Sequence, residues 1–294
     1  MFEQFDNSIF HFINGFAGQP FLDSLVNFEE QFFLLKGGLF MGVYCWLWFE
    51  YRGQRGDDQR RTIIAMVLAS FTALVIARCF SHILPFRVRP MYADVHFHAP
   101  SFPIAPNFVD WSSFPSDHAA MFFSLALGVY LLWRPLGILL LLYTAIWICL
   151  PRLYLGLHYP TDLVGGAILG SASVFSLGHL SKTKAFYQWV ARPLLNAERK
   201  YPSVFYALSF WLLFEMGVMF GDVRYAARHA SFLFQLSPKN EAILVGIFAM
   251  ILYIAVLFWR RATLDGSSRR NQEVRQSGFT AKLSGQDLQR GRSY

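Results

Sequence analysis

Long apolar runs constrain the fold of this chain more than any other feature of its sequence. A helix needs about 20 residues to cross a bilayer. Runs near that length occur at 32–51, 62–84, 136–156, 163–181, 203–220 and 242–259, and a shorter run at 119–133 becomes adequate if its helix begins at Ser116. Only 15% of the 294 residues are charged, against about 25% in soluble domains. The sequence therefore predicts an all-α polytopic membrane bundle of about seven spans.

The segments outside these runs differ in composition. Residues 1–30 carry apolar side chains at helical spacing, which favours an amphipathic helix lying in the membrane interface, with a loosely ordered segment as the alternative; these side chains are Phe5, Ile9, Phe10, Ile13 and Phe16. We expect five spans in a core at 31–181 and a linker with two additional spans at 182–261. The Ser-, Gly-, Gln- and Arg-rich segment 262–294 predicts a disordered basic tail.

Lys and Arg gather in segments that alternate with the predicted spans. They are frequent in the loops 51–61 and 182–202 and in the tail. Because basic residues favour the cytoplasmic side, these segments should face the cytoplasm and the N-terminus should be external. They also account for the net charge of +7 without a nucleic-acid partner. The three cysteines, Cys45, Cys79 and Cys149, each fall within a predicted span, which indicates apolar packing rather than disulfides or metal binding.

Three short polar islands interrupt the apolar sequence. They are residues 87–90 (Arg-Val-Arg-Pro), residues 115–118 (Pro-Ser-Asp-His), and Arg152 with His158 and Asp162. The predicted topology places all three on the external side. Ionisable residues at the ends of membrane helices are costly unless they have a function, so the polar islands are the candidate functional residues.

The third island offers a nucleophile. Pro160 suits the first turn of a helix, so His158 lies just outside that helix and Asp162 within its first turn. The Asp162 carboxylate can then reach one imidazole nitrogen, fix the tautomer and leave the other nitrogen free to attack. By themselves these residues would more often be interfacial anchors.

The second island offers an anion site and a proton donor. Ser116 precedes an apolar run as an N-cap residue does, and the N-H groups of a helix N-terminus suit a phosphate. His118 could protonate a departing oxygen. Asp117 would oppose a phosphate if it pointed inward, so we expect it to turn outward or to help cap the helix. An ordinary capped helix with an interfacial His is the alternative interpretation.

The first island offers cations. Arg89, and with it Arg87, presents forked donors that match phosphate oxygens, and Pro90 fixes the chain after them. Arginine near lipid headgroups also has simpler explanations. Together, however, the three polar islands contain the parts for cleaving a phosphate ester through a phosphohistidine. The long connection from Pro85 to about Pro115 is typical of a functional loop such as a lid.

These residues resemble the type 2 phosphatidic acid phosphatase family. The family pattern is Lys, six residues, Arg-Pro; then Pro-Ser-Gly-His; then Ser-Arg, five residues, His, three residues, Asp. The resemblance covers roughly residues 5–180, and it departs from the pattern at His82 (Lys in the family), Asp117 (Gly) and Pro151 (Ser). The Asp variant is similar to bacterial undecaprenyl-diphosphate phosphatases of the family.

The resemblance implies roles for matching residues. His158 attacks the terminal phosphorus, Asp162 orients it, and His118 serves first as acid and then as base, without a metal or other cofactor. The candidate catalytic residues are His158, His118 and Asp162, and the candidate substrate-binding residues are Arg89, Ser116, Arg152, Asp117, Arg87 and His82. Since the family Lys is absent, a protonated His82, Arg87 or Arg78 is expected to take its place.

The location of the site suggests a lipid substrate. We expect undecaprenyl diphosphate, cleaved at the periplasmic face of a bacterial inner membrane by a protein whose C-terminus is cytoplasmic. The alternatives are a phosphatidate or phosphatidylglycerol phosphate phosphatase, a lipid phosphotransferase and a non-catalytic lipid transporter. The sequence does not fix the oligomeric state.

Three further features carry weaker expectations. His96 and His98 alternate in a loop, but without a set of carboxylates they support a metal site poorly. Glu215 lies within a predicted span and is therefore a functional candidate, although a buried hydrogen bond explains it equally well. Small residues from Gly165 to Ala172 should let the helix after the third island pack closely against its neighbours.

Overall fold

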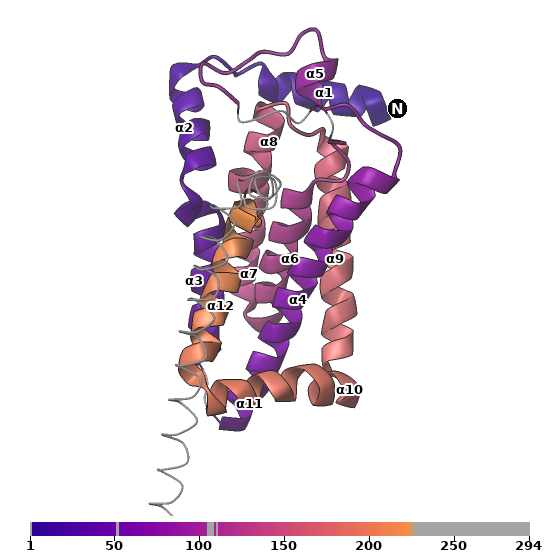
Figure 1. Cartoon of the computed structure of the whole chain (residues 1–294). Coiled ribbons are helices and arrows are strands. Elements are labelled where there is room, and N and C mark those ends of the chain that lie inside the picture. The colour runs from indigo at the N-terminus through magenta and orange to yellow at the C-terminus, as the bar shows by residue number, and fades with distance from the viewer. Residues whose placement is uncertain (1, 51–52, 105–108, 110, 224, 226–294) are drawn as a thin grey trace, which may run out of the picture. The chain divides into compact units, whose positions relative to one another are not determined.

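The computed structural model is helical, and it describes residues 2–50, 53–104, 109, 111–223 and 225. Its helices are α1 Phe2–Asn14, α2 Pro20–Gln31, α3 Leu39–Glu50, α4 Gly53–Ile83, α5 Pro90–Ala93, α6 Asp117–Leu132, α7 Arg134–Tyr143, α8 Leu150–Tyr154, α9 Pro160–Ser181, α10 Lys184–Phe186, α11 Arg192–Lys200 and α12 Pro202–Gly217, with π-helical turns at Leu34–Gly38, Thr144–Cys149 and Tyr187–Ala191 (Figure 1). The expected span at 242–259 and the expected tail at 262–294 lie outside the described residues.

The bundle is built around α4, α6 and α9, which pack against one another, while α7 packs on α6 (Figure 1). Glycines bring α9 close to α6. A Cβ atom on Gly170 would lie 2.3 Å from the Ala120 carbonyl oxygen, and one on Gly166 would lie 2.4 Å from that of Ser116. The expectation that small residues after the third island allow close packing is therefore confirmed.

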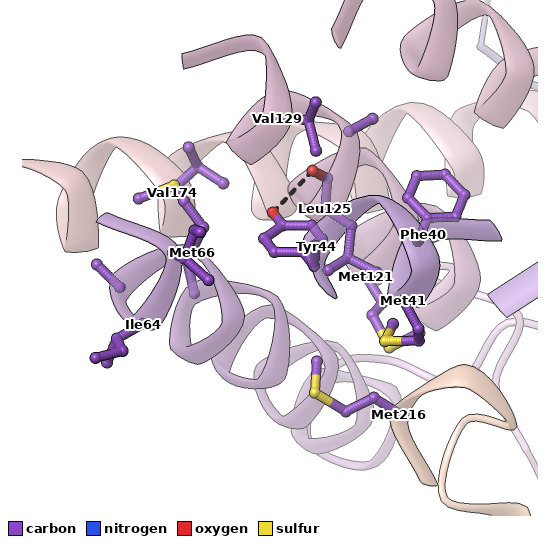
Figure 2. Close-up of a cluster of buried hydrophobic side chains, with 14 of the residues drawn as sticks. Phe40, Met41, Tyr44, Ile64, Met66, Met121, Leu125, Val129, Val174 and Met216 are labelled. Carbon is purple, nitrogen blue, oxygen red and sulfur yellow. Dashed lines mark hydrogen bonds between the residues drawn. The ribbon is translucent and has the colours of Figure 1, made fainter. Parts of the chain in front are cut away.

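Beneath the polar islands lies an apolar cluster between α3, α4 and α6 (Figure 2). Phe40, Met66 and Met121 are fully buried in it. The Tyr44 hydroxyl, also buried, donates a hydrogen bond of 3.0 Å to the Leu125 carbonyl oxygen, since a buried phenol needs a polar partner. This cluster fixes the helices on which the polar islands are carried.

The described residues contain fewer candidate spans than the seven predicted for the whole chain. Within the described residues, three helical segments are long and apolar enough to cross a membrane, Gly53–Ile83, Arg134–Tyr154 and Pro160–Ser181. A fourth is possible if α2 and the segment Leu34–Glu50, which meet at a bend of 70°, count as one span. Helix α6 is apolar but shorter. The predicted count of seven is not confirmed.

Two expected loops are largely helical. Helix α4 begins at Gly53, so most of the loop predicted at 51–61 continues the helix. The loop predicted at 182–202 contains α10, a π-helical turn and α11. Polar residues end an apolar run without ending a helix. The polar residues of these two helical segments form ion pairs, such as the 3.2 Å contact between Arg60 Nη1 and Glu198 Oε2. Of the three cysteines, Cys149 is buried, whereas Cys45 and Cys79, which were expected to pack within spans, are exposed.

The first 30 residues form two helices rather than one. Helix α1 packs on α8 and α9, and its inward face is Asp6, Phe10 and Asn14, each 0–1% exposed. Phe5, expected on the apolar face, is 52% exposed. The polar inward residues have partners across the bundle: the Asn14 amide donates to the carbonyl oxygens of His98 and Tyr154, both at 2.9 Å. Helix α1 thus covers the end of the bundle that carries the polar islands.

Candidate active site

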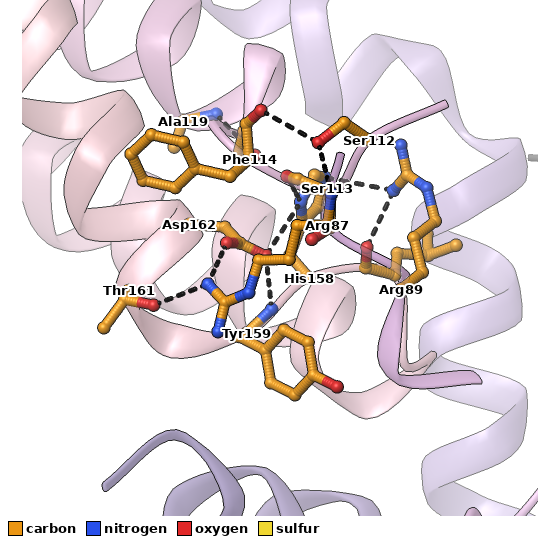
Figure 3. Close-up of polar contacts among 12 residues, drawn as sticks. Arg87, Arg89, Ser112, Ser113, Phe114, Ala119, His158, Tyr159, Thr161 and Asp162 are labelled. Atoms are coloured by element: carbon orange, nitrogen blue, oxygen red, sulfur yellow. Dashed lines mark hydrogen bonds and ion pairs between the residues drawn. The ribbon is translucent and has the colours of Figure 1, made fainter. Parts of the chain in front are cut away.

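Backbone and side-chain hydrogen bonds join the three polar islands at one end of the bundle (Figure 3). The Ser113 N-H donates to the Arg87 carbonyl oxygen at 2.9 Å, and the Ser116 N-H donates to that of Asp162 at 3.0 Å. Arg89 Nη1 donates to the Leu157 carbonyl oxygen at 2.7 Å. Residues far apart in the sequence therefore form one site, as the topology predicted.

A tight turn between α8 and α9 places the candidate nucleophile. The N-H groups of Leu157 and His158 both donate to the Arg152 carbonyl oxygen, at 2.9 and 3.3 Å. Gly156 has a φ of +65°, and a Cβ there would lie 2.7 Å from the Phe97 ring. Only glycine accepts both the positive φ and the close approach of the ring without strain. The turn therefore holds His158 next to the C-terminal end of α8.

The ring of His158 is held in one tautomer. Nδ1 lies 2.8 Å from the Ser113 carbonyl oxygen, which accepts hydrogen bonds only, so Nδ1 carries the proton. Asp162 Oδ2 is a more distant neighbour of Nδ1, at 3.8 Å. Nε2 is left with its lone pair and lies 3.5 Å from Arg89 Nη1. The expected tautomer is present, but the Ser113 carbonyl oxygen, rather than the Asp162 carboxylate, accepts the hydrogen bond that fixes it.

The charge state of His158 follows from its surroundings. The side chain is almost fully buried, and burial lowers the pKa of its imidazole below the usual value, while the nearby Asp162 carboxylate offsets part of this shift. The neutral imidazole, which is the nucleophilic form, therefore predominates at neutral pH.

Asp162 is fully buried and has two other partners. Its Oδ2 accepts the Tyr159 N-H at 2.8 Å, which caps α9, and its Oδ1 contacts Arg87 Nη1 at 2.5 Å. The other branch of Arg87 contacts Asp6 Oδ2 at 2.5 Å. Arg87 was expected to bind substrate. Its donors are instead directed to these two carboxylates and to the Thr161 hydroxyl, so Arg87 links α1 to the start of α9.

The second island is arranged differently from its prediction. Ser116 is the N-cap of α6, as expected, and its Oγ accepts the Ala119 N-H at 3.4 Å. Asp117 neither turns outward nor caps the helix, because Ser116 already fills that position. Its Oδ1 lies 2.9 Å from His118 Nδ1 and its Oδ2 lies 3.3 Å from Arg78 Nε. The carboxylate therefore faces its own neighbour and a cation from α4.

Arg152 meets acidic residues that the sequence analysis did not single out. It is 4% exposed, and its Nη2 lies 2.5 Å from Glu30 Oε1. Lys36, 5% exposed, lies 3.1 Å from Glu29 and 3.2 Å from Glu30. The sequence signal for this group was the pair Glu29 and Glu30 followed by Lys36 at the start of an apolar run, because charges in such a run need partners of opposite charge. Asp6 and Asn14, spaced for one face of α1, were a similar signal.

His82 is exposed at the end of α4, where its ring packs edge-on against Trp111 with centroids 5.1 Å apart. Arg78, one turn earlier, is the α4 cation that contacts the second island. The ring of His96 packs near that of His11. Within the described part of the chain, no group of three or more His, Cys, Asp or Glu side chains is placed to hold a metal ion.

Taken together, the site contains a neutral imidazole with a free Nε2, buried guanidinium groups at Arg89 and Arg152, the N-terminus of α6, and a second imidazole held by a carboxylate. Guanidinium groups and helix N-termini bind phosphate oxygens. An imidazole with a free lone pair attacks phosphorus, and a second one transfers protons. This arrangement suits the transfer of a phosphoryl group to His158.

Comparisons with known proteins agree with this chemistry. Residues 60–191, which contain all three polar islands, match the PAP2 superfamily. A putative undecaprenyl-diphosphatase, YbjG of Escherichia coli (strain K12), is 30% identical over 182 residues, 60% of this chain and 82% of the relative. A lipid A 4'-phosphatase of Bacteroides thetaiotaomicron is 52% identical over 59 residues, 19% of this chain and 26% of the relative. Among solved structures, Aquifex aeolicus LpxE is similar with a TM-score of 0.44 and 23% identity, over 60% of this chain and 95% of that one.

Proposed function

We propose a substrate and a reaction path for this chain from one premise: it belongs to the PAP2 superfamily. It is therefore a phosphatase of the metal-independent type and acts on lipid phosphates at a membrane. We infer that its substrate is undecaprenyl diphosphate, which it cleaves to undecaprenyl phosphate. The observation that carries the reaction is the fixed tautomer of His158, which leaves Nε2 unprotonated, 3.5 Å from Arg89 Nη1.

In the first step, the Nε2 lone pair of His158 forms a bond to the terminal phosphorus. The bond between that phosphorus and the bridging oxygen breaks, and its electron pair leaves with the lipid monophosphate. His118 donates a proton to the leaving oxygen. Arg89, Arg152 and the first N-H groups of α6 bind the other phosphate oxygens, where their charge stabilises the transition state.

In the second step, water attacks the phosphohistidine. His118, now neutral, takes a proton from the water, the bond between phosphorus and Nε2 breaks, and its electron pair returns to His158. The hydrogen bond from Nδ1 to the Ser113 carbonyl oxygen persists throughout, so the ring keeps its orientation. Inorganic phosphate leaves and the first state is restored. A phosphotransferase would differ only in that an acceptor lipid takes the place of water.

Two observations support the choice of lipid. The site lies at the ends of apolar helices, where a lipid headgroup would be located, and the relative matched over 82% of its length carries the name of a putative undecaprenyl-diphosphatase. The lipid A 4'-phosphatase relative favours a lipid monophosphate as the second candidate, and phosphatidate and phosphatidylglycerol phosphate belong to the same class.

We also propose an orientation in a bacterial inner membrane. Helix α11 and the start of α4, which carry basic residues and are joined by the ion pair between Arg60 and Glu198, lie at the end of the bundle opposite α5 and the polar islands (Figure 1). By the positive-inside rule, that end faces the cytoplasm and the site faces the periplasm. The C-terminus would then be cytoplasmic.

The test is phosphate release by detergent-purified protein from undecaprenyl diphosphate, phosphatidate, phosphatidylglycerol phosphate and lipid A, assayed side by side. We expect the fastest release from undecaprenyl diphosphate. His158→Ala should lower the rate by about 10⁴-fold or more, as removal of a covalent catalyst does. His179→Ala, an exposed residue at the far end of α9, is the matched control and should leave the rate unchanged.

The outcomes separate the parts of the proposal. Faster release from a monophosphate lipid would reject the proposed substrate and keep the phosphatase. Phosphate release by His158→Ala at the wild-type rate would reject the phosphohistidine. Brief incubation with labelled substrate should trap an acid-labile phosphoprotein in wild type and none in His158→Ala.

A further inference from the structure

A line of contacts runs from the acid-base residue to a part of the chain outside the superfamily match. His118 contacts Asp117, Asp117 contacts Arg78, and Arg78 Nη2 donates to the Met219 carbonyl oxygen at 2.9 Å. Met219 follows α12, whereas the superfamily match ends at residue 191. We propose that Asp117 is a positioning residue for His118, and that Arg78 and the backbone at Met219 hold it in place.

The contact between Asp117 and His118 decides which nitrogen faces the substrate. An ionised carboxylate only accepts hydrogen bonds, so His118 Nδ1, 2.9 Å from Asp117 Oδ1, carries a proton. Nε2 is then the nitrogen that gives up and takes back a proton during the reaction. The carboxylate also stabilises the imidazolium form, as the Asp of a Ser-His-Asp triad does.

Arg78 fixes the carboxylate itself. Neighbouring residues on a helix do not face each other, so Asp117 needs an external partner to keep its orientation toward His118. Arg78 supplies it through Nε, 3.3 Å from Oδ2. The two side chains are only 20% and 24% exposed, so the pair is well shielded from water. The cation also neutralises a carboxylate that would otherwise repel a phosphate.

The segment after α12 fixes Arg78 in turn. Met219 and Phe220 have φ angles of 56° and 55°, a left-handed turn that non-glycine residues rarely adopt. The turn directs the Met219 carbonyl toward α4, and the Phe220 ring packs on Phe71 of the same helix with centroids 5.5 Å apart. Such local strain persists only where surrounding structure holds it, and often at functional sites.

The contact between Arg78 and Asp117 connects two departures from the family pattern. The pattern has Lys where this chain has His82 and Gly where it has Asp117. Here the α4 cation lies one turn earlier, at Arg78, and it is paired with the added carboxylate. Burial is the largest effect that disfavours the protonated form of His118, and the Arg152 and Lys36 cations add to it. Glu30 is paired with both of these cations. Asp117 is the carboxylate in direct contact with the ring.

The test, which rests on the proposed acid role of His118, compares two soluble substrates of similar size. p-Nitrophenolate leaves readily without a proton, whereas phenolate needs one. In single-turnover measurements, which follow only the first step, Asp117→Asn should slow phenyl phosphate cleavage by about 100-fold and p-nitrophenyl phosphate cleavage by less than about threefold. Asp117→Glu should restore part of the loss, and Asp58→Asn, on an exposed carboxylate of α4, should have no effect.

Substitutions at Arg78 and Met219 test the two contacts that hold Asp117 in place. Arg78→Gln should show the same dependence on the leaving group, with a smaller loss. Met219→Gly keeps the left-handed turn, so the ratio of the two cleavage rates should stay as in wild type, although loss of the buried Met219 side chain should lower stability. Met219→Pro cannot adopt a positive φ, and its ratio should resemble that of Arg78→Gln.

An equal loss on both substrates would mean that Asp117 is only structural, and no loss on either would mean that it has no role. Both results overturn the inference. The proposed function fails separately, if His158→Ala cleaves both substrates at the wild-type rate.

Discussion

At the scale of single residues, the site is a set of buried charges that are matched before substrate arrives. Arg152 is paired with Glu30, and Arg87 with Asp6 and Asp162. Removing one partner of a buried pair leaves an uncompensated charge, which is strongly destabilising. The carboxylates therefore serve the fold directly. The Glu30 carboxylate also occupies the donors of Arg152 that we assign to a phosphate, so binding requires exchange of one anion for another.

The burial of His158 and its neighbouring carboxylate predict how activity depends on pH. Burial lowers the pKa of His158, so the wild-type rate should fall on the acid side only below about pH 6.5, the value of a free histidine. The Asp162 carboxylate favours the protonated ring. Asp162→Asn removes that effect, so the pKa falls further and the acid limb moves to lower pH. The maximal rate should also fall, because Arg87 loses one of its partners.

The measurement is the pH profile of kcat/KM, which reports groups of the free enzyme. Asp58→Asn again provides a control, in which the acid limb of the profile should not move. A shift of the Asp162→Asn acid limb toward higher pH would contradict this account of His158.

At the scale of elements, close helix contacts set the position of the candidate catalytic side chains. Helix α9 carries Asp162 in its first turn, and its glycines lie against the backbone of α6, which carries Ser116 and His118 at its start. The two halves of the site are therefore held together by backbone contact rather than by flexible side chains.

Two glycines of α9 give a matched pair of variants. A Cβ on Gly170 would lie 2.3 Å from a backbone oxygen, whereas one on Gly178 would meet only side-chain atoms, the nearest at 3.6 Å. Gly170→Ala should therefore destabilise the protein by about 1–3 kcal/mol, as overpacking does, and lower activity. Gly178→Ala should be neutral or slightly stabilising, because alanine favours a helix. Thermal unfolding in detergent would measure both, and equal effects would refute the packing argument.

At the scale of the whole molecule, α11 and the start of α4, which carry several basic residues, lie at the end of the described bundle opposite the polar islands (Figure 1). This separation is what orientation in a membrane requires, and it predicts which surfaces a reagent can reach from outside the cell. Val95, 91% exposed, follows α5 at the end with the polar islands, and Lys184 is exposed on α10 at the other end.

Cysteine labelling would test this orientation. In a chain without its three native cysteines, Val95→Cys should react with a membrane-impermeant maleimide in intact spheroplasts. Lys184→Cys should react only after the membrane is permeabilised. The opposite pattern would invert the proposed orientation and place the site in the cytoplasm.

Local sequence patterns predicted the helical class, the grouping of the polar islands and the N-cap at Ser116, and they indicated His158 and His118 as candidate catalytic residues. These follow from local causes: apolar run length, capping preferences and fixed spacing within short motifs. The helical extensions at Gly53 and after Ser181 were missed, because an apolar run marks the membrane but not where a helix ends.

The partner of each polar or charged group in the site, by contrast, is set by how the helices pack. The Ser113 carbonyl holds His158, Glu30 holds Arg152, and Arg78 rather than His82 reaches Asp117. Each of these contacts joins segments far apart in the chain, and a buried charge accepts whichever complementary group the packing of helices brings within about 3 Å. Spacing along one helix carries no information about that choice.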